Sequence, residues 1–468
     1  MTLAGKQVLI LGLGESGFAS ALWCLRQGAS VRVADTRANP PYLAQLQSRP
    51  EKGFHAASAD FRAGEFGKEL LAGVDLLVLS PGLNGGMMIV IHARAEGIPV
   101  VGEIELFAQA LRDLGQHVPV LAITGTNGKT TTTALTGHLL RATGKTVGVA
   151  GNISPAALTA LMDFQDAGRL PDAWVLELSS FQLETTETLY ATAATVLNIS
   201  DDHLDRYIDL GEYASVKARV FQSADDAPGV QILNRNDRRV RRMAITGRPV
   251  ISFGLDAPSV ETDFGLRENR GEPWLVQGER FLLPISELPI RGTHNAANAM
   301  AALALCQALG LDANALLPAL RNFRGLPHRV EKVAEINGVN WYDDSKGTNV
   351  GATVAALSGM GCPVVVILGG DGKGQDFSPL AKAVKAHARA AILIGRDGPL
   401  IEKEIARAGV PTPWATTLEE AVQIAGTLAQ SGDAVLLSPA CASFDMFRNY
   451  EHRAQVFIAA VKALETAC

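Results

Sequence analysis

The chain has 468 residues, of which 47% are apolar and 19% charged, with 46 glycines and a net charge of −6. This length exceeds one ordinary hydrophobic core and predicts two to four domains, and the composition is typical of an α/β protein. The small negative charge gives no general attraction to nucleic acid or an anionic membrane, so we expect neither as a partner. Five scattered cysteines without a Cys-x-x-Cys pair argue against a disulfide framework or zinc site. No apolar run approaches membrane-spanning length, and we expect a cytoplasmic protein.

Short apolar runs alternate with segments of helical periodicity along the chain, which is typical of parallel sheets with crossover helices. A first group begins with QVLILGLG at 7–14, which we interpret as a strand rather than a signal peptide. A polar joint after Leu114 precedes a second group, which starts with VLAITG at 120–125. This group includes a Gly- and Pro-rich stretch, 252–292, that is expected to hold short antiparallel strands. The joint FRGLPHR at 323–329 precedes the last group.

These groups predict an α/β fold with three domains in series. They are a Rossmann-like domain at 1–115, a central P-loop-type ATPase domain at 116–325 and a C-terminal Rossmann-like domain at 326–468. The first contains GLGESG at 12–17, a literal G-x-G-x-x-G match, and Asp35 closes the second predicted strand. An NAD-dependent dehydrogenase is therefore one interpretation, although no later segment offers a hydride-transfer constellation.

The stretch TGTNGKTTTT at 124–133 ends in Gly-Lys-Thr but lacks the first glycine of G-x-x-x-x-G-K-[ST]. It nevertheless follows an apolar strand and opens a helix, the context in which backbone N–H groups hold phosphate. Lys129 is predicted to reach the β- and γ-phosphates and Thr130 to bind Mg²⁺. The nucleotide-binding residues predicted in this loop are Gly125, Thr126, Asn127, Gly128, Lys129, Thr130 and Thr131.

Charged or titratable side chains interrupt three further segments of the central group. Glu177 lies near the carboxyl end of the strand WVLELSS, where ligands of open sheets gather; the alternative is a partly exposed glutamate on an edge strand. His203, in NISDDHLDRY, is interpreted as a metal or phosphate neighbour rather than part of a solvated turn. Lys217 lies inside the apolar stripe of the helix 212–221, and spacing alone favours a snorkelling lysine with a buried stem.

Seven segments occur in an order that matches the motifs of one enzyme family. They are GTNGKTTTT, LELSSFQLE (176–184), NISDDHLDRY, GTHNAANAMAA (292–302), LPHRVE (326–331), DDSKGTNV (343–350) and SPACASFDMF (438–447). With them the chain resembles the Mur ligases, ATP-dependent amide-forming ligases of peptidoglycan precursor synthesis and so of cell-wall biogenesis. The later segments are most similar to the branch that adds D-glutamate. The departures are extra residues near 163–172 and in 255–290, expected to be surface elaborations.

The resemblance implies the reaction and its partners. A monomer would join two small molecules, UDP-N-acetylmuramoyl-L-alanine and D-glutamate, through an acyl phosphate, using ATP and two Mg²⁺. One Mg²⁺ would be held by Thr130 and Glu177. Lys217 would carry CO₂ as a carbamate and hold the second Mg²⁺ beside His203, and desolvation favours the neutral amine that reacts with CO₂. The implied catalytic residues are Lys129, His203, Lys217 and Arg329, the last as a γ-phosphate clamp.

The resemblance also implies contacts to the base and to the substrates. Asn295, Asn298 and His328 would contact adenine and ribose, and Asp344 would contact the ribose from the third domain. The GLGESG loop would receive the UDP group instead of NAD. The implied substrate residues are Glu15, Ser16, Thr36, Arg37, Ser80, Gly82, Asn152, Ser179, Lys346, Thr348, Lys373, Ser443 and Phe444.

Alternatives stay open at the level of residues and of function. Lys373, in GGDGKGQDF, is equally well explained as part of a glycine-rich surface loop, and Ser443 as a helix N-cap. A sister ligase for another amino acid, or a folylpolyglutamate synthetase-like ligase, would share the central segments. A dehydrogenase and a non-catalytic nucleotide switch are rivals of other classes. The segments DDSKGTNV and SPACASFD favour the D-glutamate branch over the related ligases.

Overall fold

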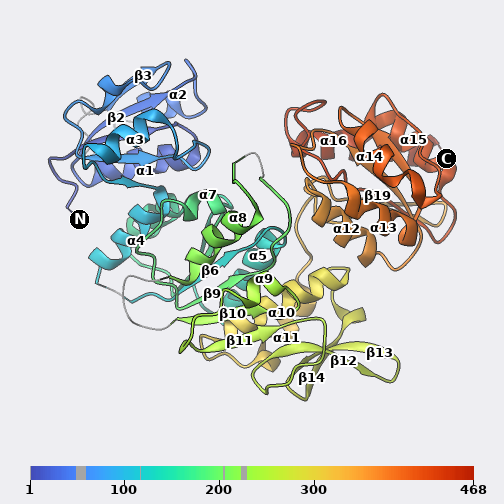
Figure 1. Ribbon diagram of the computed structural model, residues 1–468. Helices are drawn as coiled ribbons and strands as arrows, with labels where there is room; N and C mark the ends of the chain where they lie inside the picture. Colours follow the sequence, from blue (N-terminus) through green and yellow to red (C-terminus); the bar gives the residue numbers. More distant parts are fainter. Residues whose placement is uncertain (1, 49–58, 116, 204–205, 223–228, 468) are drawn as a thin grey trace.

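The computed structural model describes residues 2–48, 59–115, 117–203, 206–222 and 229–467 (Figure 1). Three separate sheets follow one another along the chain, each built from a consecutive stretch. In Figure 1 the blue N-terminal body and the orange C-terminal body lie on either side of the green and yellow central body. The expected α/β fold with three units in series is confirmed, whereas the boundaries at 115 and 325 stay predictions.

The N-terminal sheet has five parallel strands in the order β3-β2-β1-β4-β5, the Rossmann order. Its strands are β1 (Gln7–Leu11), β2 (Ser30–Asp35), β3 (Ala59–Ala63), β4 (Leu76–Leu79) and β5 (Val100–Val101). Its helices are α1 (Glu15–Arg26), α2 (Leu43–Ser48), α3 (Met88–Ala95) and α4 (Glu103–Asp113). The strands β1 and β4 are apolar almost throughout because helices cover both faces of a parallel sheet.

The central sheet has nine strands in the order β14-β13-β12-β11-β10-β9-β6-β8-β7. Its strands are β6 (Val120–Thr124), β7 (Val147–Gly151), β8 (Ala173–Glu177), β9 (Ala193–Val196), β10 (Val230–Asn234), β11 (Val250–Phe253), β12 (Phe264–Asn269), β13 (Glu272–Gln277) and β14 (Arg280–Pro284). Its helices are α5 (Lys129–Ala142), α6 (Ala157–Asp166), α7 (Ser180–Leu183), α8 (Leu210–Ala218), α9 (Arg238–Arg241), α10 (Thr293–Gln307) and α11 (Ala313–Asn322). Only β12-β13 and β13-β14 pair antiparallel, which confirms the antiparallel strands expected within 252–292.

Two features of packing place the central loops. Helix α10 is rich in alanine, is buried along most of its length and packs closely against α5. This contact brings the first turn of α10 to the start of α5. On the other side of the sheet, Trp174 of β8 packs edge-on against Phe107 of α4 and Phe164 of α6. One apolar cluster therefore continues from the N-terminal body into the central body.

The C-terminal sheet has five strands in the order β15-β16-β19-β17-β18, parallel except for β15. Its strands are β15 (Glu331–Ile336), β16 (Val339–Asp343), β17 (Val364–Gly369), β18 (Ala388–Ile394) and β19 (Ala434–Leu437). Its helices are α12 (Val350–Gly359), α13 (Ser378–His387), α14 (Gly398–Ile405), α15 (Leu418–Leu428) and α16 (Tyr450–Ala467). Across the described ranges, every helix is too short or too polar to cross a bilayer.

Candidate active site

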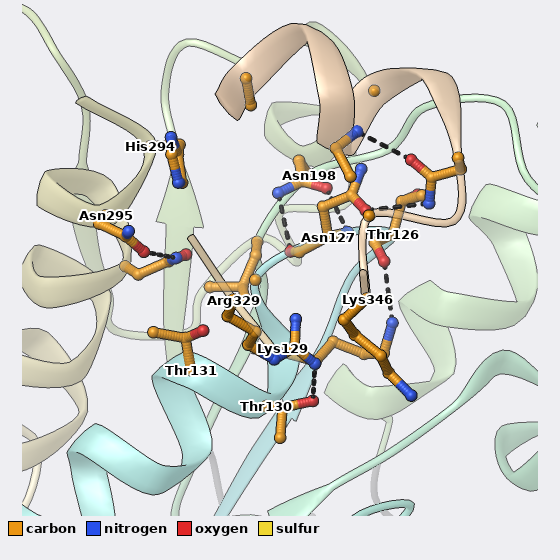
Figure 2. Close-up of a pocket in the computed structure, with 18 of the residues that line it drawn as sticks. Thr126, Asn127, Lys129, Thr130, Thr131, Asn198, His294, Asn295, Arg329 and Lys346 are labelled. Carbon is orange, nitrogen blue, oxygen red and sulfur yellow. Dashed lines mark hydrogen bonds between the residues drawn. The ribbon is translucent and has the colours of Figure 1, made fainter. Parts of the chain in front are cut away.

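A cavity of about 880 Å³ lies where the central and C-terminal bodies meet, within the size range of small-molecule sites. Its walls come from the loop before α5, the carboxyl ends of β8 and β9, the start of α10, and the segments after β16. Figure 2 shows side chains from both bodies facing this space. The cavity is lined by many of the predicted residues: Thr126, Asn127, Gly128, Lys129, Thr130, Thr131, Asn152, Glu177, His203, Asn295, Asn298, His328, Arg329, Asp344, Lys346 and Thr348.

The shortened loop needs its two glycines for steric reasons. Gly125 and Gly128 have φ values of +144° and +85°, which L side chains rarely adopt. A Cβ at Gly128 would also lie 2.4 Å from Asn298 Oδ1, because α10 packs closely against the loop. The position where the longer motif has its first glycine is Ile123, a buried strand residue. The strand, loop and helix therefore form an anion-binding turn without that glycine.

Lys129 and Thr130 open α5 beneath this turn, as predicted. Lys129 Nζ donates to the carbonyl oxygens of Gly125 and Thr126 at 3.0 and 2.9 Å, so the ammonium lies inside the loop. Burial lowers the pKa of Lys129, against the opposing effect of the nearby Glu177. Thr130 Oγ1 accepts a 2.5 Å hydrogen bond from Arg329 Nη2, as Figure 2 shows. An arginine from the C-terminal side thus reaches the nucleotide loop directly.

Glu177 ends β8 and is 2% exposed. Strand β8 lies between β6 and β7, so the alternative of an exposed edge-strand glutamate is wrong. Its Oε1 accepts a 2.6 Å hydrogen bond from Asn152 Nδ2, while Oε2 is buried with no partner among the described residues. A buried carboxylate oxygen without a donor is costly unless a cation or water satisfies it. The Oε2 atom of Glu177 is therefore available to bind a cation or a water.

Lys217 lies in α8 and is 1% exposed, so the snorkelling alternative is wrong. Its Nζ donates to Thr124 Oγ1 at 3.4 Å and lies 4.6 Å from the centroid of the Tyr213 ring. No carboxylate in the described part of the chain lies within ion-pair distance of it. Burial lowers the pKa of Lys217 well below its usual value, and the nearby Lys129 lowers it further. A lowered pKa favours the neutral amine, the form that reacts as a nucleophile.

His203 also lies near Tyr213, with the two ring centroids 6.4 Å apart. Its ring also meets Phe181 edge-on at 4.7 Å, and its backbone N–H donates to Asp202. Burial lowers the pKa of His203, opposed by the charge of Asp202. A neutral imidazole keeps a lone pair for a metal ion. Asp205, which follows, lies outside the described residues.

The residues predicted to contact base and ribose line the same cavity as the loop. Asn295 donates to Arg291 O and accepts from Asn298 Nδ2, and Figure 2 shows Asn295 to the left of the loop residues Thr126 and Asn127. His328 Nδ1 lies 2.6 Å from Asp343 Oδ2. Asp344 accepts a 2.7 Å hydrogen bond from Ser438, and burial raises its pKa to about 7.

The residues predicted for the amino acid divide into two places. Lys346 and Thr348 line the cavity, and Lys346 Nζ lies 3.6 Å from the ring centroid of Tyr450. Burial lowers the pKa of Lys346 to about 8. Lys373 is exposed with a φ of +50°, as the surface-loop alternative expects, and Phe444 is 70% exposed.

Ser443 is buried and begins no helix, because the next helix starts at Tyr450; the helix N-cap alternative is therefore wrong. An antiparallel bridge between Asp371 and Ala442 holds the loop of Lys373 beside Ser443. Lys373 and Ser443 therefore lie on neighbouring segments, and neither residue lines the cavity. Ser179 also lies outside it, as the N-cap of α7 within a capping box.

The GLGESG loop makes contacts that its glycine pattern does not predict. Glu15 accepts hydrogen bonds from Ser154 Oγ at 2.7 Å and Ala156 N at 3.1 Å, both in the central body. Glu103 accepts from Leu158 N at 2.6 Å, and burial raises its pKa to about 7. Helix α6 has no side-chain cap of its own, so these two carboxylates satisfy its first amides. The carboxylate of Glu15 is therefore hydrogen-bonded to the neighbouring domain and does not face an open loop surface.

The carboxylate of Asp35 is already hydrogen-bonded within the domain, which does not favour a role in binding the ribose of NAD. Its carboxylate accepts from Leu13 N at 2.8 Å and from Arg37 Nη2 at 2.7 Å, and the Arg37 hydrogen bond lowers its pKa to about 2. Ser80 Oγ donates to Gly12 O at 2.9 Å and closes the other side of the loop. Ser16 is partly buried at the start of α1, while Thr36, Arg37 and Gly82 are exposed around it. These residues form an open rim around the loop.

Several residues of the site were not predicted. Asn198 accepts from Asn127 N and donates to Asn127 O, which fixes the loop from the end of β9. His294 lines the cavity, its Nδ1 has no hydrogen-bond partner in the described part of the chain, and burial lowers its pKa to about 4. Tyr450 and Asn349 also line the cavity. Asn198, His294 and Asn349 lie within recognised motifs, which was the available signal, whereas the place of Tyr450 depends on the tertiary fold.

A loop of the nucleotide-binding type, a buried carboxylate oxygen free to bind a cation and an arginine that reaches the loop from the third domain are the features expected of a three-domain nucleotide-dependent ligase. Family models match most of the chain: a Mur ligase MurD-like N-terminal domain at 6–102, a Mur ligase middle domain at 123–306 and a Mur ligase glutamate ligase domain at 328–441. The chain belongs to the Mur ligase family, and the dehydrogenase interpretation is therefore wrong.

Individual relatives extend along the full length of the chain. The UDP-N-acetylmuramoylalanine–D-glutamate ligase of Aromatoleum aromaticum is 57% identical, covering 99% of this chain and 98% of the relative. The enzyme of the same name from Nitrosospira multiformis is 55% identical, covering 100% and 97%. Among solved structures, the UDP-N-acetylmuramate–alanine ligase MurC of Thermotoga maritima covers 98% of this chain and 99% of its own, with a TM-score of 0.60 at 19% identity. That similarity describes the fold alone.

Proposed function

We propose that this protein is an ATP-dependent ligase that joins D-glutamate to UDP-N-acetylmuramoyl-L-alanine in peptidoglycan precursor synthesis. The alanyl carboxylate attacks the γ-phosphorus of ATP, and ADP leaves. The amine of D-glutamate then attacks the acyl phosphate carbonyl, forming the amide while inorganic phosphate leaves and the amine loses a proton. Phosphorylation is needed because a carboxylate is a poor electrophile. The observation that carries the proposal is the junction of Lys129, Thr130 and Arg329 in one cavity wall.

Lys129 and Arg329 serve the phosphoryl transfer. Both cations face the loop whose N–H groups would hold the phosphates, and they come from different domains. In a loose phosphoryl-transfer transition state, catalysis consists mainly of positioning and of stabilising charge on the transferred group. Arg329 would bind the γ-phosphate when its domain is seated, so nucleotide chemistry depends on closure. Asn295, Asn298, His328 and Asp344 lie where base and ribose contacts are needed.

The residues present fit two Mg²⁺ ions. Glu177 offers a buried unpartnered oxygen, Thr130 a hydroxyl beside the phosphate loop, and His203 a neutral ring. Bound Mg²⁺ supplies charge neutralisation at the phosphate oxygens. Glu177 and Thr130 would hold one ion, and His203 together with a modified Lys217 the other.

Lys217 is proposed to carry CO₂. Its neutral nitrogen attacks the carbon of CO₂ to form a carbamate, and the proton leaves to solvent, so a cation in an apolar surrounding becomes an anionic oxygen ligand. Support comes from its burial, its single long hydrogen bond to Thr124 and the missing ion-pair partner among the described residues. Lys217 does not line the cavity itself; it lies behind its wall, with Tyr213 near both its Nζ and the ring of His203, which does line the cavity.

The substrates are assigned to the outer domains. The open rim formed by Ser16, Thr36, Arg37, Ser80 and Gly82 would receive the UDP group. Glu15 is proposed to hold that domain in place through α6 instead of contacting uracil. Lysines and hydroxyls suit the two carboxylates of D-glutamate, and this part of the site comprises Lys346, Thr348, Lys373 and Ser443, with Phe444 at its edge. Asn152 and Ser179 would contact the substrate near its reacting end.

Phosphate release by the purified chain tests the specificity of the proposed reaction. With Mg²⁺, ATP and UDP-N-acetylmuramoyl-L-alanine, we expect release to require D-glutamate and to be weak with L-glutamate, L-lysine or diaminopimelate. A Lys129→Met variant, prepared identically, is the control for contaminating ATPase. Release that ignores D-glutamate, or that prefers L-lysine or diaminopimelate, would contradict the assignment.

A further inference from the structure

Asn349 connects the third domain to the nucleotide loop. It is the N-cap of α12, where its Oδ1 accepts a 2.9 Å hydrogen bond from Ala352 N. The same side chain donates from Nδ2 to Asn127 Oδ1 at 3.0 Å and to Asp202 Oδ2 at 3.3 Å. One amide therefore uses its oxygen within its own helix and its nitrogen across the domain boundary.

Both acceptors lie in the catalytic surroundings. Asn127 belongs to the phosphate loop and is held by two hydrogen bonds to Asn198, whose side chain lies next to it in Figure 2. Asp202 precedes His203 and accepts from its backbone N–H. Any movement of Asn349 would therefore displace Asn127 in the loop and Asp202 beside the proposed second metal site.

The approach of α12 to the loop is close. A Cβ at Gly351 would lie 2.9 Å from Ser200 Oγ and 3.0 Å from Asn127 Nδ2. The N–H of Val350 donates to Gln375 Oε1, and Gln375 Nε2 donates to Ala440 O. The first turn of α12 is therefore tied to the loop that carries Lys373, on the side proposed for the amino acid.

We propose that Asn349 is a positioning residue that couples seating of the third domain to the geometry of the phosphate loop. This inference rests on the proposed ligase function. When the domain is seated, Nδ2 satisfies Asn127 and Asp202 together, which favours the closed arrangement in which Arg329 reaches Thr130. When the domain is not seated, the helix cap survives but both cross-domain bonds are absent.

The variant Asn349→Asp separates these two roles. Aspartate caps helices as well as asparagine, so α12 keeps its cap, but both amide donors are lost and a second carboxylate faces Asp202. We expect kcat for amide formation to fall about ten- to a hundredfold, the size of effect that slight misplacement of reacting groups produces. The melting temperature should stay at the wild-type value, and the Kd for an ATP analogue should rise much less than kcat falls, by no more than the part of its binding that depends on closure.

A charge exchange provides the decisive comparison. In Asn349→Asp combined with Asp202→Asn, the new amide at 202 can donate to the new carboxylate at 349. We expect the double variant to be at least about fivefold more active than the product of the two single effects, because contacting residues are not additive. Thr417→Ala, which removes the cap of α15 in the same domain, should lower stability without this change in kcat.

Small-angle X-ray scattering of the full chain with Mg²⁺ and a non-hydrolysable ATP analogue measures closure independently of turnover. Wild type should become more compact, and Asn349→Asp should remain more open. Additive kcat effects, or an Asn349→Asp variant with wild-type kcat and compaction, would overturn the proposal. If the ligase assignment itself were wrong, wild type would release no phosphate with D-glutamate, whereas the scattering comparison would still report on Asn349.

Discussion

Replacing Lys217 by alanine is expected to lower kcat by about a thousandfold or more, as loss of a preorganised electrostatic group does. The side chain is buried beside Thr124 and Tyr213, lacks a carboxylate partner among the described residues and has a lowered pKa. A buried lysine in this state contributes little as a cation. Lys217 is proposed to act as a carbamate, so the alanine variant loses an anionic metal ligand rather than a positive charge.

Rescue distinguishes this role from packing. Lys217→Ala leaves space in which formate or acetate can supply the missing carboxylate, so short acids should restore part of the activity. Lys217→Met fills the same space without an amine and should be equally inactive but not rescued. Lys385→Ala, at an exposed lysine of α13, is the control for lysine removal. Normal turnover of Lys217→Ala in CO₂-depleted buffer would leave the carbamate without support.

Replacing Arg329 by alanine is expected to lower kcat by about 10³-fold with a smaller effect on nucleotide affinity, as for arginines that act on the transferred phosphoryl group. The guanidinium reaches Thr130 Oγ1 from a neighbouring domain. Arg329 comes from another domain and is not part of the loop that holds the phosphates. We therefore expect it to stabilise the transition state more than it strengthens ATP binding. Arg329→Lys should recover only part of the rate, since an ammonium lacks the planar fork.

Single-turnover measurement of ADP formation checks this prediction, with ATP-analogue binding measured by calorimetry. Arg324→Ala is the matched control, because Arg324 is exposed in the same joint, five positions earlier in the printed sequence. Equal losses in analogue affinity and in kcat would mean that Arg329 serves ground-state binding. An unchanged rate would remove it from the site.

Local patterns predicted the elements and the residues that lie at their ends. The strand-loop-helix context identified the phosphate loop, and the carboxyl end of β8 identified Glu177, because both depend on neighbouring sequence. The state of Glu177 depends on strand order: β8 lies inside the sheet although β7 precedes it in the chain. Likewise, spacing placed Lys217 in an apolar stripe, but its complete burial follows from packing of α8 near Thr124 of β6.

Contacts between domains were beyond local reasoning. The bond from Glu15 to Ser154 and the bond from Asn349 to Asn127 join positions far apart in sequence. A glycine pattern predicts that Glu15 lies near a ligand, yet a neighbouring helix without a cap takes its carboxylate. Ser443 precedes a segment that forms turns before α16, so a capping residue type was present without a helix to cap.

Transfer of isotopic oxygen tests the proposed chemistry most directly. UDP-N-acetylmuramoyl-L-alanine labelled with oxygen-18 in its alanyl carboxylate is incubated with the purified chain, Mg²⁺, ATP and D-glutamate, and the released phosphate is analysed by mass spectrometry. The account predicts that a carboxylate oxygen leaves with the phosphate, because that oxygen forms the acyl phosphate bond. Phosphate that contains no label while the amide accumulates would contradict it.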